Sequence, residues 1–141
     1  MKIAEAQAHI VEEFSLFTDW MDKYEYLIDL GKTLTPYPQE KKVEEYLIPG
    51  CQSRVWLFAW IESGKLFFLA DSDAIITKGI ISLLINVFSG HTPKEIVEAN
   101  TDFIDQIGLK EHLSPTRANG LVSMIKQIKT YAHESVSAAG E

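Results

Sequence analysis

The sequence has a single cysteine, Cys51, and only four histidines. One cysteine excludes an intramolecular disulfide, and a closed zinc site would need three further ligands from the histidines. These are the dispersed residues His9, His91, His112 and His133, which do not lie at metal-ligand spacing. We therefore expect neither a disulfide framework nor a metal centre.

Basic residues are also scarce, with 13 Lys and Arg against 20 Asp and Glu and a net charge of −7. Charge of this sign repels nucleic acid and anionic membrane surfaces, so neither is an expected partner. The longest apolar run, residues 79–88, is shorter than the ~20 residues that cross a bilayer. The N-terminal residues lack the layout of a secretory or transit peptide. We expect a cytoplasmic protein.

The chain has 141 residues, 46% apolar and 23% charged, as is typical of one folded domain. Apolar residues at helical spacing predict helices over residues 3–17 and 19–31, followed by an exposed, proline-containing loop over 32–45. Residues 43–48 are a candidate strand. Runs rich in aromatic and β-branched residues predict a hairpin of strands 55–61 and 66–69 around the turn Ser63-Gly64. Both faces of the first strand are apolar, so we expect helices to cover the sheet on at least one of them.

Further helices follow the hairpin. Residues 71–73 offer capping side chains before a mostly buried helix over 74–88, and shorter helices are expected from Thr92 and over 101–107. The last helix begins at Ser114-Pro115. The pattern predicts an α+β fold, with a small antiparallel sheet packed against several helices. It forms one domain over residues 1–134, with a flexible tail over 135–141.

Cys51 follows the turn pair Pro49-Gly50 and precedes three polar residues, 52–54, that lead into the first strand of the hairpin. Two interpretations stay open. A free cysteine is often a small buried hydrophobe, but a thiol at a loop tip is also placed to react. Useful nucleophilicity needs a nearby cation, a helix N-terminus or a base that raises the thiolate fraction.

Charged residues elsewhere have competing interpretations as well. Arg117 lies in the first turn of the last helix, where a cation opposes the helix dipole. It is either a solvated surface residue or one that faces an anion or an acidic partner. Asp71 and Asp73 are more often capping residues than a metal or acid–base pair, although Asp73 could also serve partner recognition.

Residues 50–56 read Gly-Cys-Gln-Ser-Arg-Val-Trp, and this segment resembles the reactive-cysteine motif of the SufE family, Gly-Cys-x-Ser-x-Val-Trp. Three more segments resemble the family in the family's order. They are residues 24–31 (Tyr-Glu-Tyr-Leu-Ile-Asp-Leu-Gly), residues 71–79 with Asp-Ser-Asp-Ala and Lys-Gly, and residues 113–121 (Leu-Ser-Pro-Thr-Arg-Ala-Asn-Gly-Leu).

The resemblance implies a fold similar to the IscU-type iron–sulfur scaffolds and a role as sulfur acceptor and carrier. Cys51 would take persulfide sulfur from a SufS- or CsdA-like cysteine desulfurase, stimulate that enzyme, and pass the sulfur to a SufBCD-type scaffold or another acceptor. The pyridoxal phosphate belongs to the desulfurase, so no cofactor of its own is expected. By motif, Gly50, Gln52, Ser53, Asp73 and Arg117 are candidates for shaping the loop or contacting the partner.

The motifs do not separate the SufE branch from the CsdE-like branch of the family. Two other classes of function also remain. A cysteine hydrolase would use Cys51 with His112 or His91 as base and would turn over a small substrate alone. A passive binding module would keep all function after Cys51→Ser.

Overall fold

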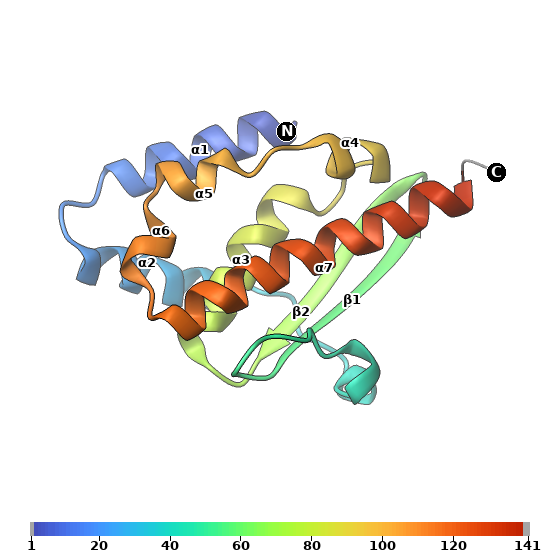
Figure 1. Ribbon diagram of the computed structural model, residues 1–141, viewed down its shortest axis with the longest axis horizontal. Coiled ribbons are helices and arrows are strands. Elements are labelled where there is room, and N and C mark those ends of the chain that lie inside the picture. The colour runs from blue at the N-terminus through green and yellow to red at the C-terminus, as the bar shows by residue number, and fades with distance from the viewer. Residues whose placement is uncertain (1, 140–141) are drawn as a thin grey trace.

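The structure is a computed structural model that describes residues 2–139. It confirms the α+β class, with one two-stranded antiparallel sheet and helices before and after it (Figure 1). The elements in chain order are α1 (Ile3–Ser15), α2 (Trp20–Lys32), η1 (Gln39–Lys41), η2 (Glu44–Tyr46), β1 (Val55–Glu62), β2 (Lys65–Ser72), α3 (Ile75–Phe88), α4 (Pro93–Glu98), α5 (Asp102–Gln106), α6 (Leu109–His112) and α7 (Pro115–Ala139).

The hairpin forms as the sequence predicts, and β2 extends to Ser72. Ser63 and Gly64 join the strands with φ values of 53° and 77°, the backbone that a tight two-residue hairpin turn requires. Alternate residues of both strands face the core: Val55, Leu57, Leu66, Phe68 and Ala70 are all buried. One face of the sheet therefore joins the main core, as the alternation indicates.

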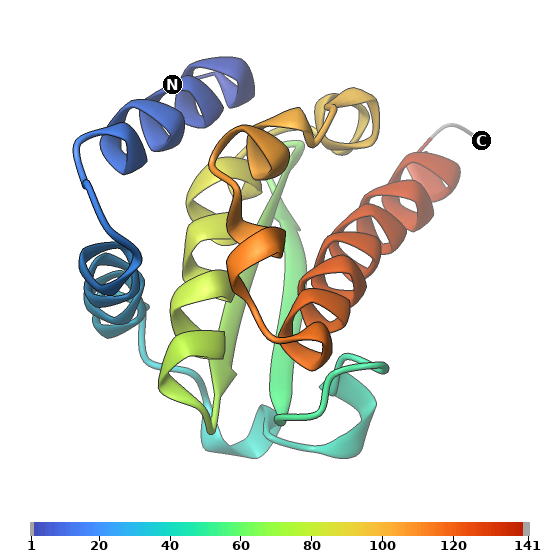
Figure 2. The ribbon, with the colours of Figure 1, turned by 60° about the vertical axis from the view of Figure 1, so that its left-hand side comes forward.

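Helix α3 is the centre of the core and is buried along most of its length. It packs on the sheet, with α1 and α2 on one side and α7 on the other (Figure 2). Helices α2 and α3 pack tightly at Gly79, where an added Cβ would lie 2.1 Å from the Leu27 carbonyl oxygen. Nearby, the Ser82 hydroxyl donates to the Leu30 carbonyl over 2.8 Å. The first half of α3 is thereby fixed against α2.

Residues 71–73 do not cap α3 in the simple way that their side chains suggest. The N-cap is Ala74, whose N–H donates to the Ser72 hydroxyl at 3.3 Å. The Asp71 carboxylate instead pairs with Lys42 at 2.8 Å and Lys78 at 3.4 Å. Each lysine pairs with a different oxygen of the Asp71 carboxylate. Asp71, at the end of β2, therefore connects the segment before η2 to the hairpin and to α3.

Residues 43–48 are not a strand, which corrects the sequence-based prediction. Glu44, Glu45 and Tyr46 form the single turn η2, and the segment meets the sheet at one isolated bridge, between Leu47 and Trp56. The Ile48 N–H donates to the Val55 carbonyl over 2.9 Å. Because the residues of η2 are helical, they cannot pair as a third strand. Backbone hydrogen bonding to β1 is therefore confined to the end of the segment that is nearest to Cys51 in the chain.

The last helix is longer than predicted. Residues 135–139, expected as a tail, continue α7, and residues 140–141 lie outside the described residues. Serine and alanine allow this continuation, and the Ser135 hydroxyl donates to the Tyr131 carbonyl one turn earlier, at 2.9 Å. The Tyr131 hydroxyl donates to Leu57 in β1 at 3.1 Å, which fixes α7 across the hairpin. No helix among residues 2–139 is both long and apolar enough to span a bilayer.

Candidate functional site

The loop between η2 and β1 depends on Gly50. Its φ of 89° lies in the left-handed region that favours glycine, and a Cβ at this position would lie 2.4 Å from the Ser123 hydroxyl oxygen of α7. Both the backbone conformation and the close approach to α7 therefore require glycine. The result is that the next residue, Cys51, is held against the first half of α7.

The Cys51 side chain is half-buried and points to the backbone of α7. Its S–H donates to the Gly120 carbonyl oxygen, with 3.6 Å between sulfur and oxygen. A Cβ on Gly120 would lie 3.7 Å from the sulfur, which is an ordinary contact distance, so the thiol lies directly against this part of the helix. The sequence marks Asn119-Gly120 as poor helix formers, and the structure gives Gly120 this position under the thiol.

The thiol borders a cavity of about 300 Å³ between the loop, α3 and α7. Ile80 and Met124, both almost fully buried, line its inner part. Arg117, Ser114 and Thr116, all exposed, line its outer part. The cavity thus has apolar walls near the core and polar side chains near solvent, and it has space for atoms added to the Cys51 sulfur.

Burial raises the pKa of the Cys51 thiol above its ordinary value. The hydrogen bond to a carbonyl acts in the same direction, because it needs the proton to stay on sulfur. In this position the thiol is neutral, and only the thiolate is a strong nucleophile. Nucleophilicity needs a nearby cation, a helix N-terminus or a base, and in this conformation the hydrogen-bond partner of the thiol is the backbone carbonyl of Gly120.

The candidate loop and partner residues fall into two groups. Gln52, Ser53 and Arg117 line the cavity together with Cys51, although they come from the loop and from the first turn of α7. Asp73 does not line it. Its carboxylate accepts the Arg54 N–H at 3.1 Å, and its own N–H donates to the Arg54 carbonyl at 3.3 Å. Asp73 thus fixes the point at which the loop enters β1.

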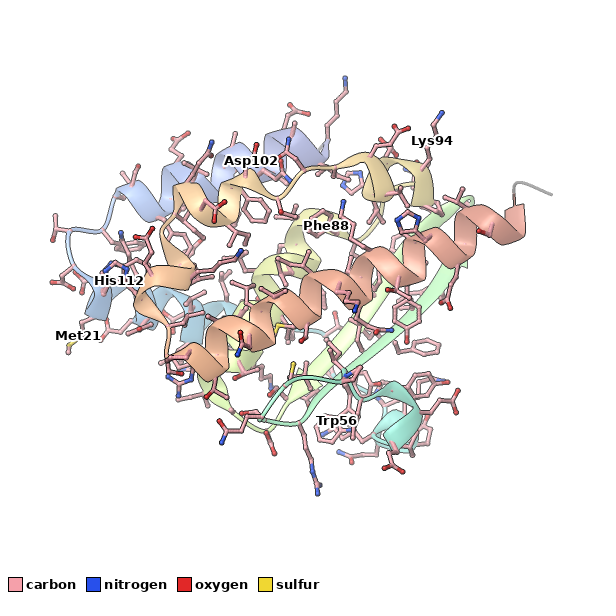
Figure 3. All side chains as sticks on the ribbon, viewed as in Figure 1. Met21, Trp56, Phe88, Lys94, Asp102 and His112 are labelled. Atoms are coloured by element: carbon pink, nitrogen blue, oxygen red, sulfur yellow. The ribbon has the colours of Figure 1, made fainter. Side chains whose placement is uncertain are left out.

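The histidines that a cysteine hydrolase would need lie elsewhere. His112 stacks on Trp20 with 3.9 Å between ring centroids, at the α6 end of the molecule, far from the start of β1 that Trp56 marks (Figure 3). His91 pairs with Leu66 at the other end of the hairpin. Among the described residues, no histidine lines the Cys51 cavity. The structure thus offers no histidine base beside this thiol.

Sequence reasoning missed the inner wall of the cavity. Thr77, Ile80 and Met124 lie within predicted helices, and nothing local distinguishes Ile80 or Met124 from other core residues. Thr77 is one of two buried polar residues of α3, with Ser82, so its type alone does not single it out. The sequence does not show that it lines the same cavity as the thiol.

Comparisons with known proteins show the family of this chain. The family model described as "SufE: Fe-S metabolism associated domain" matches residues 8–132. An uncharacterized SufE-like protein from Synechocystis is 43% identical over 125 residues, which cover 89% of this chain and 79% of that protein. A second, from Rhizobium meliloti, is 40% identical over 128 residues, covering 87% and 91%.

The fold is also shared with a solved protein. The solution structure of a hypothetical protein from Thermus thermophilus superposes with a TM-score of 0.77 at 20% identity, covering 94% of this chain and 96% of that one. At this identity the likeness supports the fold alone. The family match and the two relatives cover most of the chain, and the range of the family match includes Cys51 and Arg117. The protein belongs to the SufE family, whose domain is associated with iron–sulfur metabolism.

Proposed function

We propose that this protein is a sulfur acceptor and carrier for iron–sulfur cluster assembly, and that Cys51 carries the sulfur as a persulfide. The observation that carries the proposal is the placement of the single cysteine. It lies on a glycine-dependent loop, beside a cavity with room for added atoms, in a chain of the SufE family. The donor is a SufS- or CsdA-like cysteine desulfurase that holds a persulfide on its own cysteine.

The proposed step is a thiol–persulfide exchange. The Cys51 thiolate attacks the terminal sulfur of the desulfurase persulfide, forming a new S–S bond while the donor's S–S bond breaks. The electron pair of the broken bond leaves with the donor cysteine as a thiolate, and the proton of the terminal S–H stays with the transferred sulfur. No net oxidation occurs, so no oxidant or reductant is needed. Clearing its persulfide in this way stimulates the desulfurase.

Attack requires Cys51 to leave the position beside Gly120. There the thiol is neutral, since burial and the carbonyl acceptor both disfavour the thiolate. We propose that the segment around Pro49 and Gly50 swings the side chain outward when the desulfurase docks. Exposure to water restores the ordinary pKa, and a cation of the partner can lower it further. The conformation described here is therefore the resting state of the carrier.

The residues around the loop have distinct proposed roles. The exposed Arg117 side chain at the cavity opening contacts the desulfurase, while Gln52 and Ser53 shape the loop that moves. Asp73 limits the movement by holding Arg54 at the loop's end. After transfer, the loop returns the loaded sulfur to the cavity. It then delivers the sulfur to a SufBCD-type scaffold or another acceptor, and we place these steps in the cytoplasm.

The desulfurase itself tests this proposal. Alanine release from L-cysteine by a matched desulfurase is measured with increasing amounts of wild-type protein, Cys51→Ser and His91→Ala. Wild type and His91→Ala should stimulate release, and Cys51→Ser should not. Stimulation by Cys51→Ser equal to wild type would show that the thiol does not accept sulfur and would refute the proposal.

A further inference from the structure

Thr77 is one of two buried polar residues of α3, with 7% of its surface exposed. It lies near the start of the helix and lines the cavity that holds the Cys51 thiol. The surrounding wall is apolar, with Ile80 one turn further along α3 and Met124 on α7. A hydroxyl in this wall is costly unless it has a hydrogen-bond partner. Its position therefore requires an explanation.

The second buried polar residue shows the usual solution. The Ser82 hydroxyl donates to the Leu30 carbonyl of the neighbouring helix at 2.8 Å. Within residues 2–139, by contrast, no side-chain hydrogen bond involves Thr77, whereas every fully enclosed side-chain nitrogen and oxygen atom there has a partner. The Thr77 hydroxyl is therefore not fully enclosed. Because the residue is otherwise buried and lines the cavity, the space that its hydroxyl borders is the cavity that also holds the Cys51 thiol.

A persulfide on Cys51 changes what the cavity must supply. The inner sulfur, now bonded to carbon and sulfur, has no hydrogen and can no longer donate to the Gly120 carbonyl. The terminal sulfur, about 2.05 Å further out, is more acidic than a thiol and carries the negative charge. It needs hydrogen-bond donors. The other donor side chains that line the cavity are exposed or, in Ser53, half-buried on the loop itself, whereas Thr77 is the buried one, on α3; the others are Gln52, Ser53, Ser114, Thr116 and Arg117.

We infer that the Thr77 hydroxyl binds the terminal sulfur of the Cys51 persulfide while the loop is closed. This inference rests on the proposed carrier function. The unloaded thiol is held in the cavity by its hydrogen bond to the Gly120 carbonyl. The persulfide lacks that bond, and the hydrogen bond from the Thr77 hydroxyl holds it in the cavity instead. A small thiol reaches the persulfide when the loop opens. A hydrogen bond that stabilises the closed loop lowers the fraction of molecules with an open loop, and so it lowers the rate at which the sulfur is lost.

Three substitutions at position 77 test the inference. Thr77→Val keeps the branched shape and removes the hydroxyl, Thr77→Ala removes it with a smaller side chain, and Thr77→Ser keeps it. Each protein is loaded with an immobilised desulfurase and L-cysteine, freed of both, and exposed to a fixed concentration of glutathione. The persulfide is followed by intact mass. Urea denaturation confirms that each variant is folded at the assay temperature.

All variants should load to the wild-type level, because loading occurs with the loop open. Thr77→Val and Thr77→Ala should then lose the sulfur about 5-fold faster than wild type, the effect of one net hydrogen bond. Thr77→Ser should stay within about 2-fold of wild type. If Thr77→Val loses sulfur at the wild-type rate, or Thr77→Ser as fast as Thr77→Val, the inference is overturned while the carrier function stands. Failure of wild type to load would overturn both.

Discussion

The Cys51 thiol and the Gly120 carbonyl are 69 residues apart in the chain and 3.6 Å apart in the folded protein. The carbonyl oxygen accepts a hydrogen bond from S–H and would repel a negatively charged sulfur. This contact therefore holds the cysteine in its unreactive form beside the cavity. Sulfur transfer requires the contact to break, so the loop that carries Cys51 controls the chemistry as well as the position of the thiol.

The pH dependence of Cys51 alkylation tests this resting state. Burial raises the thiol pKa, and only the thiolate reacts, so the midpoint of the rate against pH should lie above that of a cysteine peptide. Unfolding in urea should lower the midpoint to the peptide value. The rate with iodoacetamide, measured by mass over a pH series, checks this. A midpoint at or below the peptide value in the folded protein would contradict a protonated resting thiol.

Gly50→Ala should release the thiol from its place beside α7. The new Cβ would lie 2.4 Å from the Ser123 hydroxyl at a φ of 89°, and strain of this kind costs about 1–3 kcal/mol. Alkylation of Cys51 at neutral pH should therefore accelerate. Gly64→Ala is the matched control, because its φ of 77° is similar but no atom lies within 4 Å.

The control should lose stability in urea without a change in Cys51 alkylation. Equal alkylation rates for Gly50→Ala and wild type would argue that the approach of Gly50 to Ser123 does not hold the thiol in place.

Gly79→Ala should destabilise the fold by about 3 kcal/mol, because the Cβ would lie 2.1 Å from the Leu27 carbonyl and would force α2 and α3 apart. The matched control is Gly120→Ala, another helical glycine, whose Cβ would make an ordinary contact of 3.7 Å with the Cys51 sulfur. Its stability should be unchanged or raised by up to about 1 kcal/mol. Urea denaturation measures both. Equal stability of the two variants would contradict the close helix crossing.

The sequence was sufficient for the hairpin because its signals are local. The aromatic and β-branched runs and the pair Ser63-Gly64 indicate the strands and the turn, and in the structure Glu62 and Lys65 pair on either side of that turn. The segment 43–48 shows the limit of this reasoning. Its apolar residues suit a strand, but the turn at Glu44–Tyr46 satisfies the backbone locally and leaves one bridge to β1. Competition between such alternatives depends on tertiary contacts that a local pattern does not contain.

The candidate site was predicted only in part, because some of its residues come together only through tertiary contacts. Cys51, Gln52 and Ser53 are neighbours in the chain, and Arg117 entered through a motif, so sequence brought them together. The cavity that they share depends on where α3 and α7 pass the loop. Thr77 and Gly120 acquire their roles from that packing. The sequence left the protonation state of the thiol open, because burial and the Gly120 acceptor are properties of the packed state.

Arg117→Ala should weaken the interaction with the desulfurase without changing the resting thiol. Its exposed side chain lies at the cavity opening, so its loss should raise the concentration that gives half-maximal stimulation by about 5-fold, roughly 1 kcal/mol. Lys126→Ala, an exposed cation of the same helix that does not line the cavity, should leave this concentration unchanged. Equal effects of both variants would indicate a general charge effect in place of a contact at the site.

The central claim is that Cys51 carries sulfur, and intact mass tests it most directly. The protein is incubated with a matched desulfurase and L-cysteine, and its mass is recorded before and after a reductant is added. The account predicts a gain of about 32 Da on wild type, absent from Cys51→Ser and reversed by the reductant. A wild-type protein whose mass does not change, under conditions in which the desulfurase itself becomes loaded, would contradict it.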